Sequence, residues 1–215
     1  MIRKRAIGRY SLLIVASAIV IGQAPIATAA VYQIQLGGVD LSYDGTNVVD
    51  GGIVDPDPLT NATFLYDNVL LGAYTTGVTL DLFVPDVFNI PVGGGQVLSA
   101  PQGTLYLDLS GGEFLSLTLE EAIISYIPLS STVHFVFAGS AGSIDGQQLP
   151  FGISLIDPVS VSFSTQLMQS VSHDGTYINA FVSSGTGEIQ AIPEPATLGL
   201  LALGSMGLLK RKRRA

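Results

Sequence analysis

Short runs of alternating apolar and polar residues recur through the middle of the chain. The runs with a period of two, or nearly so, are Val31–Leu36, Val78–Val84, Thr104–Leu109, Phe114–Leu119, Thr132–Phe137, Phe151–Ile156, Val159–Phe163 and Tyr177–Val182. Successive side chains of a strand point to opposite faces, so each run can bury one face and expose the other. Gly, Asp, Asn and Pro separate the runs. The pattern predicts an all-β fold: a single antiparallel β-sandwich or jelly-roll-like domain.

One segment, Leu117–Tyr126, could form either a helix or a strand. Its acidic pair at positions 120 and 121 suits a helix. The β-branched Ile123 and Ile124 and the nearby Pro128 favour a strand equally well. The sequence leaves both alternatives open.

The N-terminal segment has the three zones of a secretory signal peptide. Basic residues come first, an apolar stretch follows over Leu12–Ile21, and small residues end the segment. The small residues fit cleavage just before Ala30, and cleavage before Val31 fits nearly as well. We therefore expect a helical signal peptide at 1–29 and an exported domain at 30–192. An uncleaved N-terminal anchor is the alternative, which the shortness of the apolar stretch disfavours.

The C-terminal segment combines two prolines, an apolar stretch and a basic cluster. Because proline neither donates to a sheet nor fits inside a helix, Pro193 and Pro195 should end the folded domain. Ala196–Leu209 holds apolar or small residues only. As a helix it would span about 21 Å, against about 30 Å for a bilayer core. We expect a short hydrophobic anchor helix within 193–215; an ordinary permanent single-pass anchor is the alternative.

Every Lys and Arg of the chain lies in one of these two terminal segments. Basic residues beside apolar segments stay on the cytoplasmic side of a membrane. Both clusters therefore predict that the domain between them lies outside the inner membrane. The topology-determining basic residues of the tail are Lys210, Arg211, Lys212, Arg213 and Arg214.

The C-terminal tail resembles the PEP-CTERM sorting signal. The resemblance rests on Pro193-Glu194-Pro195, on the Gly/Leu/Ala-rich stretch after it and on the terminal basic cluster. It implies that Pro193, Glu194 and Pro195 are recognised by an exosortase, a membrane-embedded, transpeptidase-like enzyme that cleaves near the motif. It also implies an inner-membrane-tethered precursor in a Gram-negative bacterium, which is then released or transferred to the cell surface or extracellular matrix. The resemblance leaves the rest of the chain unassigned.

The predicted exported domain is acidic and has no basic side chain other than histidine. Of the 17 Asp and Glu residues, all but Glu194 lie in it. Nucleic-acid binding needs Lys and Arg to neutralise phosphates, so this class of partner is excluded. The carboxylates must instead be hydrated, bonded to backbone N–H groups or neutralised by cations. Cysteine is absent, so the fold stands without disulfides.

The densest acidic group is Asp50, Asp55 and Asp57. Aspartate before glycine or proline usually marks a turn, and all three have such a neighbour. Their oxygens could also bind Ca²⁺, but the twelve-residue loop pattern with a closing Glu is missing. Ca²⁺ is therefore the one candidate cofactor, and a solvated acidic loop is the alternative.

Catalytic motifs are scarce. No G-x-S-x-G sequence is present, and two histidines (His134 and His173) without cysteine make a zinc site unexpected. Glu113 with Glu120 and Glu121 could form a glycosidase pair, but the chain has no Trp to line a sugar-processing cleft. We predict that the protein is not an enzyme.

Two function classes follow. The favoured one is an exported non-enzymatic surface or extracellular-matrix protein whose acidic domain contributes to a hydrated polysaccharide matrix. Its partners would be the secretion machinery, the exosortase, the inner membrane through the C-terminal helix, and extracellular polysaccharide. The alternative is a carbohydrate-binding β-sandwich that uses exposed Tyr and Asp side chains, with or without Ca²⁺. A binding module should present a concave face with clustered tyrosines, whereas a matrix protein need not.

Overall fold

The computed structural model describes residues 31–51, 56–128, 132–137, 143–157 and 159–191. Regular structure in this part of the chain is almost entirely antiparallel β-strand, with a 3₁₀ turn at Pro150–Gly152. The all-β prediction is therefore confirmed. The predicted signal-peptide and anchor helices lie outside the described residues. Within those residues, no helix has both the length and the apolar character needed to cross a membrane.

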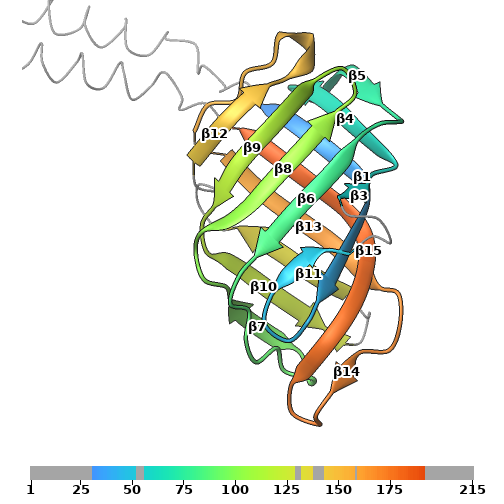
Figure 1. The fold of residues 1–215 in the computed structure, drawn as a ribbon, viewed down its shortest axis with the longest axis vertical. Helices are drawn as coiled ribbons and strands as arrows, with labels where there is room; N and C mark the ends of the chain where they lie inside the picture. Colours follow the sequence, from blue (N-terminus) through green and yellow to red (C-terminus); the bar gives the residue numbers. More distant parts are fainter. Residues whose placement is uncertain (1–30, 52–55, 129–131, 138–142, 158, 192–215) are drawn as a thin grey trace, which may run out of the picture. The chain divides into compact units, whose positions relative to one another are not determined.

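The strands follow one another closely along the chain (Figure 1). They are β1 (Tyr32–Tyr43), β2 (Val48–Asp50), β3 (Asp57–Pro58), β4 (Asn61–Tyr66), β5 (Val69–Tyr74), β6 (Thr79–Val84), β7 (Gly95–Leu98), β8 (Gly103–Leu109), β9 (Glu113–Leu119), β10 (Ala122–Ile127), β11 (Thr132–Phe137), β12 (Ser143–Gln148), β13 (Val159–Leu167), β14 (Ser172–His173) and β15 (Ile178–Ala191). The main path of the sheet runs β12-β9-β8-β6-β2-β1-β15-β13-β11-β10-β7. Strand β4 joins this path through β1, and β5 pairs with β4.

The long strands β1 and β15 form the centre of the sheet. They pair along the whole length of β1, from Tyr32 opposite Ala191 to Tyr43 opposite Phe181. On its other side β1 pairs first with β4 and then with β2. Between the segments that pair with β4 and with β2, strand β1 has a bulge at Gly37–Val39. A β-bulge of this kind bends the strand. Gly38 is required there because its φ is +73° and a Cβ would approach Thr60 Cγ2 to 2.6 Å.

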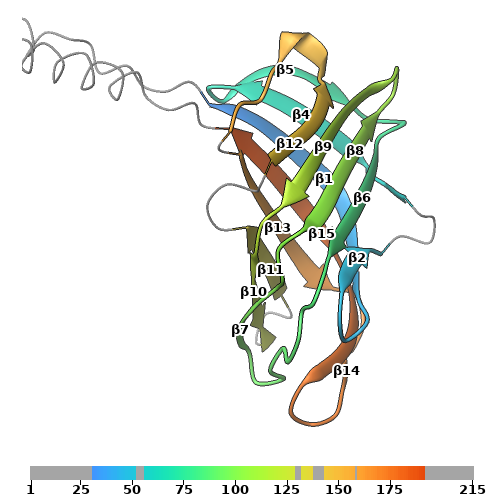
Figure 2. The same ribbon diagram turned by 60° about the vertical axis from the view of Figure 1, so that its left-hand side comes forward.

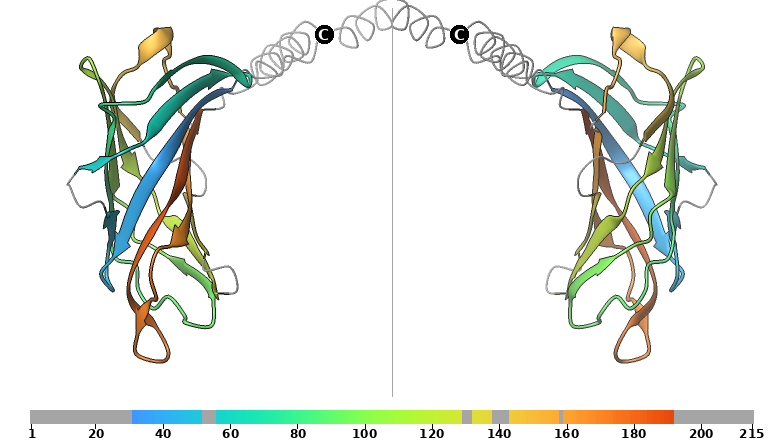
Figure 3. Two further views of the ribbon diagram at one scale, coloured as in Figure 1. Left: turned by 90° about the vertical axis from the view of Figure 1, so that its right-hand side faces the viewer. Right: turned by 90° about the vertical axis from the view of Figure 1, so that its left-hand side faces the viewer.

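The curled sheet encloses one hydrophobic core. Strands β6, β8 and β9 lie across from β1, β15 and β13 when the domain is viewed from several sides (Figure 2, Figure 3). Alternate residues of these strands are buried between the two walls, among them Leu105, Leu107, Ile34 and Ile189. The core thus resembles that of a sandwich, although the walls belong to one continuous sheet.

Most predicted strands appear in the structure, and one does not. The ambiguous segment Leu117–Tyr126 forms the end of β9 and most of β10, so the strand alternative is correct. The predicted strand Phe151–Ile156 is wrong, because Phe151 has a φ of +58° inside the 3₁₀ turn. The side-chain amide of Gln147 makes the hydrogen bonds that a paired strand would make with Leu155. It accepts from Leu155 N and donates to Leu155 O, each at 2.9 Å.

Candidate functional site

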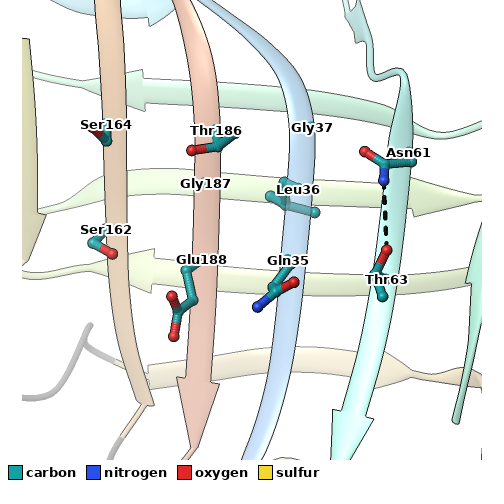
Figure 4. Close-up of a pocket in the computed structure, with 10 residues that line it drawn as sticks. All are labelled: Gln35, Leu36, Gly37, Asn61, Thr63, Ser162, Ser164, Thr186, Gly187 and Glu188. Atoms are coloured by element: carbon teal, nitrogen blue, oxygen red, sulfur yellow. Dashed lines mark hydrogen bonds between the residues drawn. The ribbon is translucent and has the colours of Figure 1, made fainter. Parts of the chain in front are cut away.

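A polar groove on the outer face of the sheet is the main candidate binding site. Its volume is about 350 Å³. It is lined by Gln35, Leu36, Gly37, Asn61, Thr63, Ser162, Ser164, Thr186, Gly187 and Glu188 (Figure 4). These residues come from β13, β15, β1 and β4, which run side by side at this point.

Strand register places the polar side chains in rows. Ser162 lies opposite Glu188, Glu188 opposite Gln35, and Gln35 opposite Thr63. The next row runs through Ser164, Thr186, Gly37 and Asn61. The residues between the rows point inward and are buried, so the polar rows occupy the outer face. The groove is therefore a product of the same alternation that builds the core.

The chemistry of the groove is that of hydroxyl, amide and carboxylate groups. Gln33 Nε2, beside the groove, donates to Glu188 Oε1 at 2.7 Å, and Asn61 Nδ2 donates to Thr63 Oγ1 at 3.5 Å. Glu188 is the one carboxylate that lines the groove among the described residues. Such a surface can exchange several hydrogen bonds with a hydroxylated ligand. No aromatic side chain stands among these lining residues, so stacking against a sugar ring is not provided there.

The carbohydrate-contacting residues expected from the sequence were exposed Tyr and Asp, and none of the residues that line the groove is of either type. The alternating runs held a partial signal: Gln35 and Ser162 are polar positions of two runs, whereas the other polar residues that line the groove lie outside the runs. That signal does not say which strands lie side by side. Only the pairing of β13, β15, β1 and β4 brings the polar positions together.

Two residues of the predicted calcium group, Asp50 and Asp57, lie close together. The N–H of Asp57 donates to Asp50 Oδ2 at 3.2 Å, and the N–H of Leu82 donates to Asp50 Oδ1 at 3.3 Å. Asp57 is only 2% exposed, and its Oδ2 accepts from the N–H of Asp40 at 2.9 Å. Both carboxylates thus tie neighbouring strands together by accepting backbone N–H groups.

The third residue of that group, Asp55, lies outside the described residues. Within the described ranges, no group of three or more His, Asp or Glu side chains is arranged to hold a metal ion. Calcium binding by Asp50, Asp55 and Asp57 therefore stays a prediction.

Burial raises the pKa of both Asp50 and Asp57 above the usual carboxyl range. Nearby carboxylates act in the same direction, Asp81 on Asp50 and Asp40 on Asp57. The backbone N–H donors oppose the shift but do not cancel it. In a domain without Lys or Arg, no basic side chain of that kind can neutralise these buried charges.

This site predicts how stability depends on pH. A carboxyl group with a raised folded-state pKa binds protons more tightly when folded, so its contribution is full below the unfolded pKa and is lost as pH rises through the folded pKa. Between about pH 7 and about pH 4, Asp57→Asn should therefore be stabilised less by acidification than the unmutated protein. Urea unfolding at a series of pH values measures this difference.

Asp108→Asn is the matched control, because Asp108 lies on an exposed position of β8. Its pH profile should follow that of the unmutated protein. Coincident profiles for Asp57→Asn and Asp108→Asn would contradict the assignment of the pH effect to the buried Asp57 carboxyl group.

The other candidate residues are scattered. Glu113 accepts a hydrogen bond from the Tyr74 hydroxyl, which raises the pKa of that tyrosine. Glu113 is the first residue of β9 and Glu120 directly follows its last, so the two lie about 23 Å apart at ~3.3 Å per residue, whereas glycosidase carboxylates lie about 5 to 10 Å apart. His134 belongs to β11, and His173 Nδ1 accepts from the N–H of Gly175 at 3.1 Å. The structure does not bring Glu113 and Glu120 together as the predicted pair.

Comparison with known proteins assigns only the C-terminal tail. No curated protein and no solved structure matches the chain. Pro193, Glu194, Pro195 and the basic cluster at 210–214 lie outside the described residues. Residues 191–214, however, match the model of the PEP-CTERM protein-sorting motif, starting at Ala191, the last residue of β15. The chain thus carries a PEP-CTERM sorting signal, which implies an exported protein that an exosortase processes at the membrane.

Proposed function

We propose that the chain is a non-enzymatic surface or extracellular-matrix protein of a Gram-negative bacterium. The observation that carries the proposal is the sorting motif at 191–214, which begins where the β-domain ends. The domain is then the cargo, and the tail is its delivery signal. The separation of all Lys and Arg residues into the terminal segments supports the same division.

In this proposal the chain passes through three stages. The signal peptide at 1–29 directs export and is removed. The apolar stretch after Pro195 then holds the precursor in the inner membrane, while the basic residues at 210–214 stay in the cytoplasm. The exosortase finally recognises Pro193, Glu194 and Pro195 and separates the domain from its anchor.

The delivered domain would contribute negative charge to a hydrated polysaccharide matrix. Its exposed carboxylates are spread over several strands and turns; they include Asp44, Asp81, Asp86, Asp108, Asp145, Asp157, Asp174, Glu120 and Glu121. At neutral pH these groups repel one another and stay hydrated. Divalent cations, held by carboxylates of neighbouring chains or polymers, would bridge them.

Cell fractionation tests the delivery step. In a host with its exosortase the domain should reach the surface or the medium. In the same host without the exosortase gene it should remain with the inner membrane. Equal release in both strains would contradict the proposal.

A second candidate function is carbohydrate binding, which the polar groove favours. Its rows of hydroxyl and amide groups suit hydrogen bonding to a hydroxylated polymer. We expect the double variant Gln35→Ala with Thr186→Ala to bind a glycan ligand at least about tenfold more weakly, a loss of about 1.4 kcal/mol. Glycan arrays, followed by titration of the best glycan, provide the measurement.

The control for this second candidate is Thr104→Ala, an exposed position on β8 away from the groove. Repeating the glycan titration with a chelator present distinguishes calcium-dependent from calcium-independent binding. If no glycan binds, or if Thr104→Ala weakens binding as much as the groove variant does, the carbohydrate-binding alternative fails.

A further inference from the structure

The hairpin of β4 and β5 ends in an exposed apolar tip. Val69 is 63% exposed, Leu70 62% and Leu71 39%, and Tyr66 across the turn is also exposed. We call Tyr66, Val69, Leu70 and Leu71 the apolar tip. The turn itself, Asp67-Asn68, has positive φ at both residues, as in the tight turns that join two strands directly.

The tip departs from the pattern of the rest of the sheet. Elsewhere, exposed strand positions are mostly polar, whereas here three consecutive apolar residues face solvent. A bulge opposite Phe64 and Leu65 adds the extra residue that breaks the alternation. Strand β5 pairs only with β4 among the described strands, so its outer edge is open. Exposed apolar residues that lie together commonly mark an interaction surface.

The tip lies at the end of the domain where the two terminal segments attach. Ala191, the last residue of β15, is opposite Tyr32, and Tyr32 is opposite Tyr66. The rings of Tyr32 and Tyr66 are 4.9 Å apart. The N–H of Val31 donates to Asp67 Oδ1 at 2.8 Å, and the N–H of Asp67 donates to Val31 O at 3.0 Å. The hairpin turn is thus fixed beside the entry and exit of the chain.

Chain length then limits how far the tip can be from the anchor. Two strand spacings of about 4.8 Å separate Ala191 from Tyr66. Only residues 192–195 connect Ala191 to the apolar stretch that starts at Ala196. Each residue spans at most about 3.5 Å, so the stretch begins less than about 20 Å from the exit of the domain. An anchored precursor must hold this end of the domain close to the bilayer.

We propose that the apolar tip inserts into the interfacial layer of the membrane that holds the precursor. The inference rests on the proposed membrane-tethered stage. Tyrosine is enriched at membrane interfaces, and leucine and valine enter the adjoining acyl region, so the residue types suit this contact. Asp67 is the only acidic residue of the hairpin, and it faces the N–H of Val31. Insertion would hold the cleavable junction after Ala191 at the membrane surface, where a membrane-embedded enzyme can reach it.

Single-cysteine labelling of the full precursor tests this contact, since the chain has no cysteine of its own. Three variants are needed: Leu70→Cys at the tip, Leu201→Cys in the apolar stretch and Phe88→Cys as the matched control. Phe88 is an exposed apolar residue beyond the other end of β1, near Val87, whose carbonyl accepts from the Tyr43 hydroxyl. Each variant is labelled with a polarity-sensitive dye and reconstituted in phosphatidylcholine vesicles that carry a lipid-linked quencher.

The expected result is a shift to shorter emission wavelength, with quenching, at positions 70 and 201 but not at position 88. Lipid contact at 201 with a water-like label at 70 would overturn the tip inference and leave the tether intact. A water-like label at 201 would contradict the proposed tether, and the tip inference with it. Energy transfer between copies labelled at position 70, without lipid quenching, would assign the tip to self-association and overturn the membrane contact.

Discussion

Replacing Pro193, Glu194 and Pro195 together by alanine is expected to abolish release of the protein. The domain should still be exported, because the predicted signal peptide at 1–29 is unchanged, and it should remain in the membrane fraction with its tail attached. The reason is that, in the proposed pathway, the exosortase recognises these three residues, whereas the apolar stretch and the basic cluster proposed to hold the precursor are unchanged. Fractionation and immunoblotting in an exosortase-containing host measure the effect.

The matched control leaves Pro193, Glu194 and Pro195 unchanged and carries a substitution in the β-domain. Asp108→Asn alters one exposed carboxylate on β8 and should be released normally. Normal release of the triple alanine variant would show that the motif residues are not needed. In that case release would not depend on recognition of Pro193, Glu194 and Pro195 by the exosortase.

Phe64→Ala is expected to lower the free energy of unfolding by about 3 to 5 kcal/mol. Phe64 is 0% exposed in β4, and its ring lies 5.7 Å from that of Phe151 and 6.1 Å from that of Tyr74. Truncation would leave a cavity in a core that no disulfide supports. A domain of this kind is typically stable by only about 5 to 15 kcal/mol, so the loss is a large share of the total. Urea unfolding of the domain measures it.

Phe88→Ala removes the same side chain from a position that is 49% exposed. We expect a change within about 0.5 kcal/mol there, as for most surface substitutions. Equal losses at positions 64 and 88 would mean that the core does not lie where the structure has it. Such a result would also remove the basis for placing the groove on the outer face.

The strands could be predicted from the sequence because alternation is a local property. Thr104–Leu109 and Phe114–Leu119 match β8 and β9 to within a residue at each end. Phe151–Ile156 shows the limit of this signal. Its residues alternate, but Pro150 and the positive φ of Phe151 start a turn, and Gln147 supplies the hydrogen bonds that a strand neighbour would have made.

The groove and the curl of the sheet could not be predicted in the same way. Both depend on pairs that are distant in sequence, such as Gln35 with Glu188. On either side of the bulge at Gly37–Val39, β1 pairs with a different strand, first β4 and then β2. The alternation of apolar and polar residues does not indicate which strand pairs with β1. The tail is the opposite case, since its motif, apolar stretch and basic cluster are consecutive and can be recognised without a fold.

The intact mass of the protein released from an exosortase-containing host tests most directly whether the sorting signal is removed. The expected product is a mature chain that begins at Ala30 or Val31 and ends near the Pro193-Glu194-Pro195 motif, without the apolar stretch and without Lys210–Arg214. Released protein that still carries Lys210–Arg214 would contradict the sorting account.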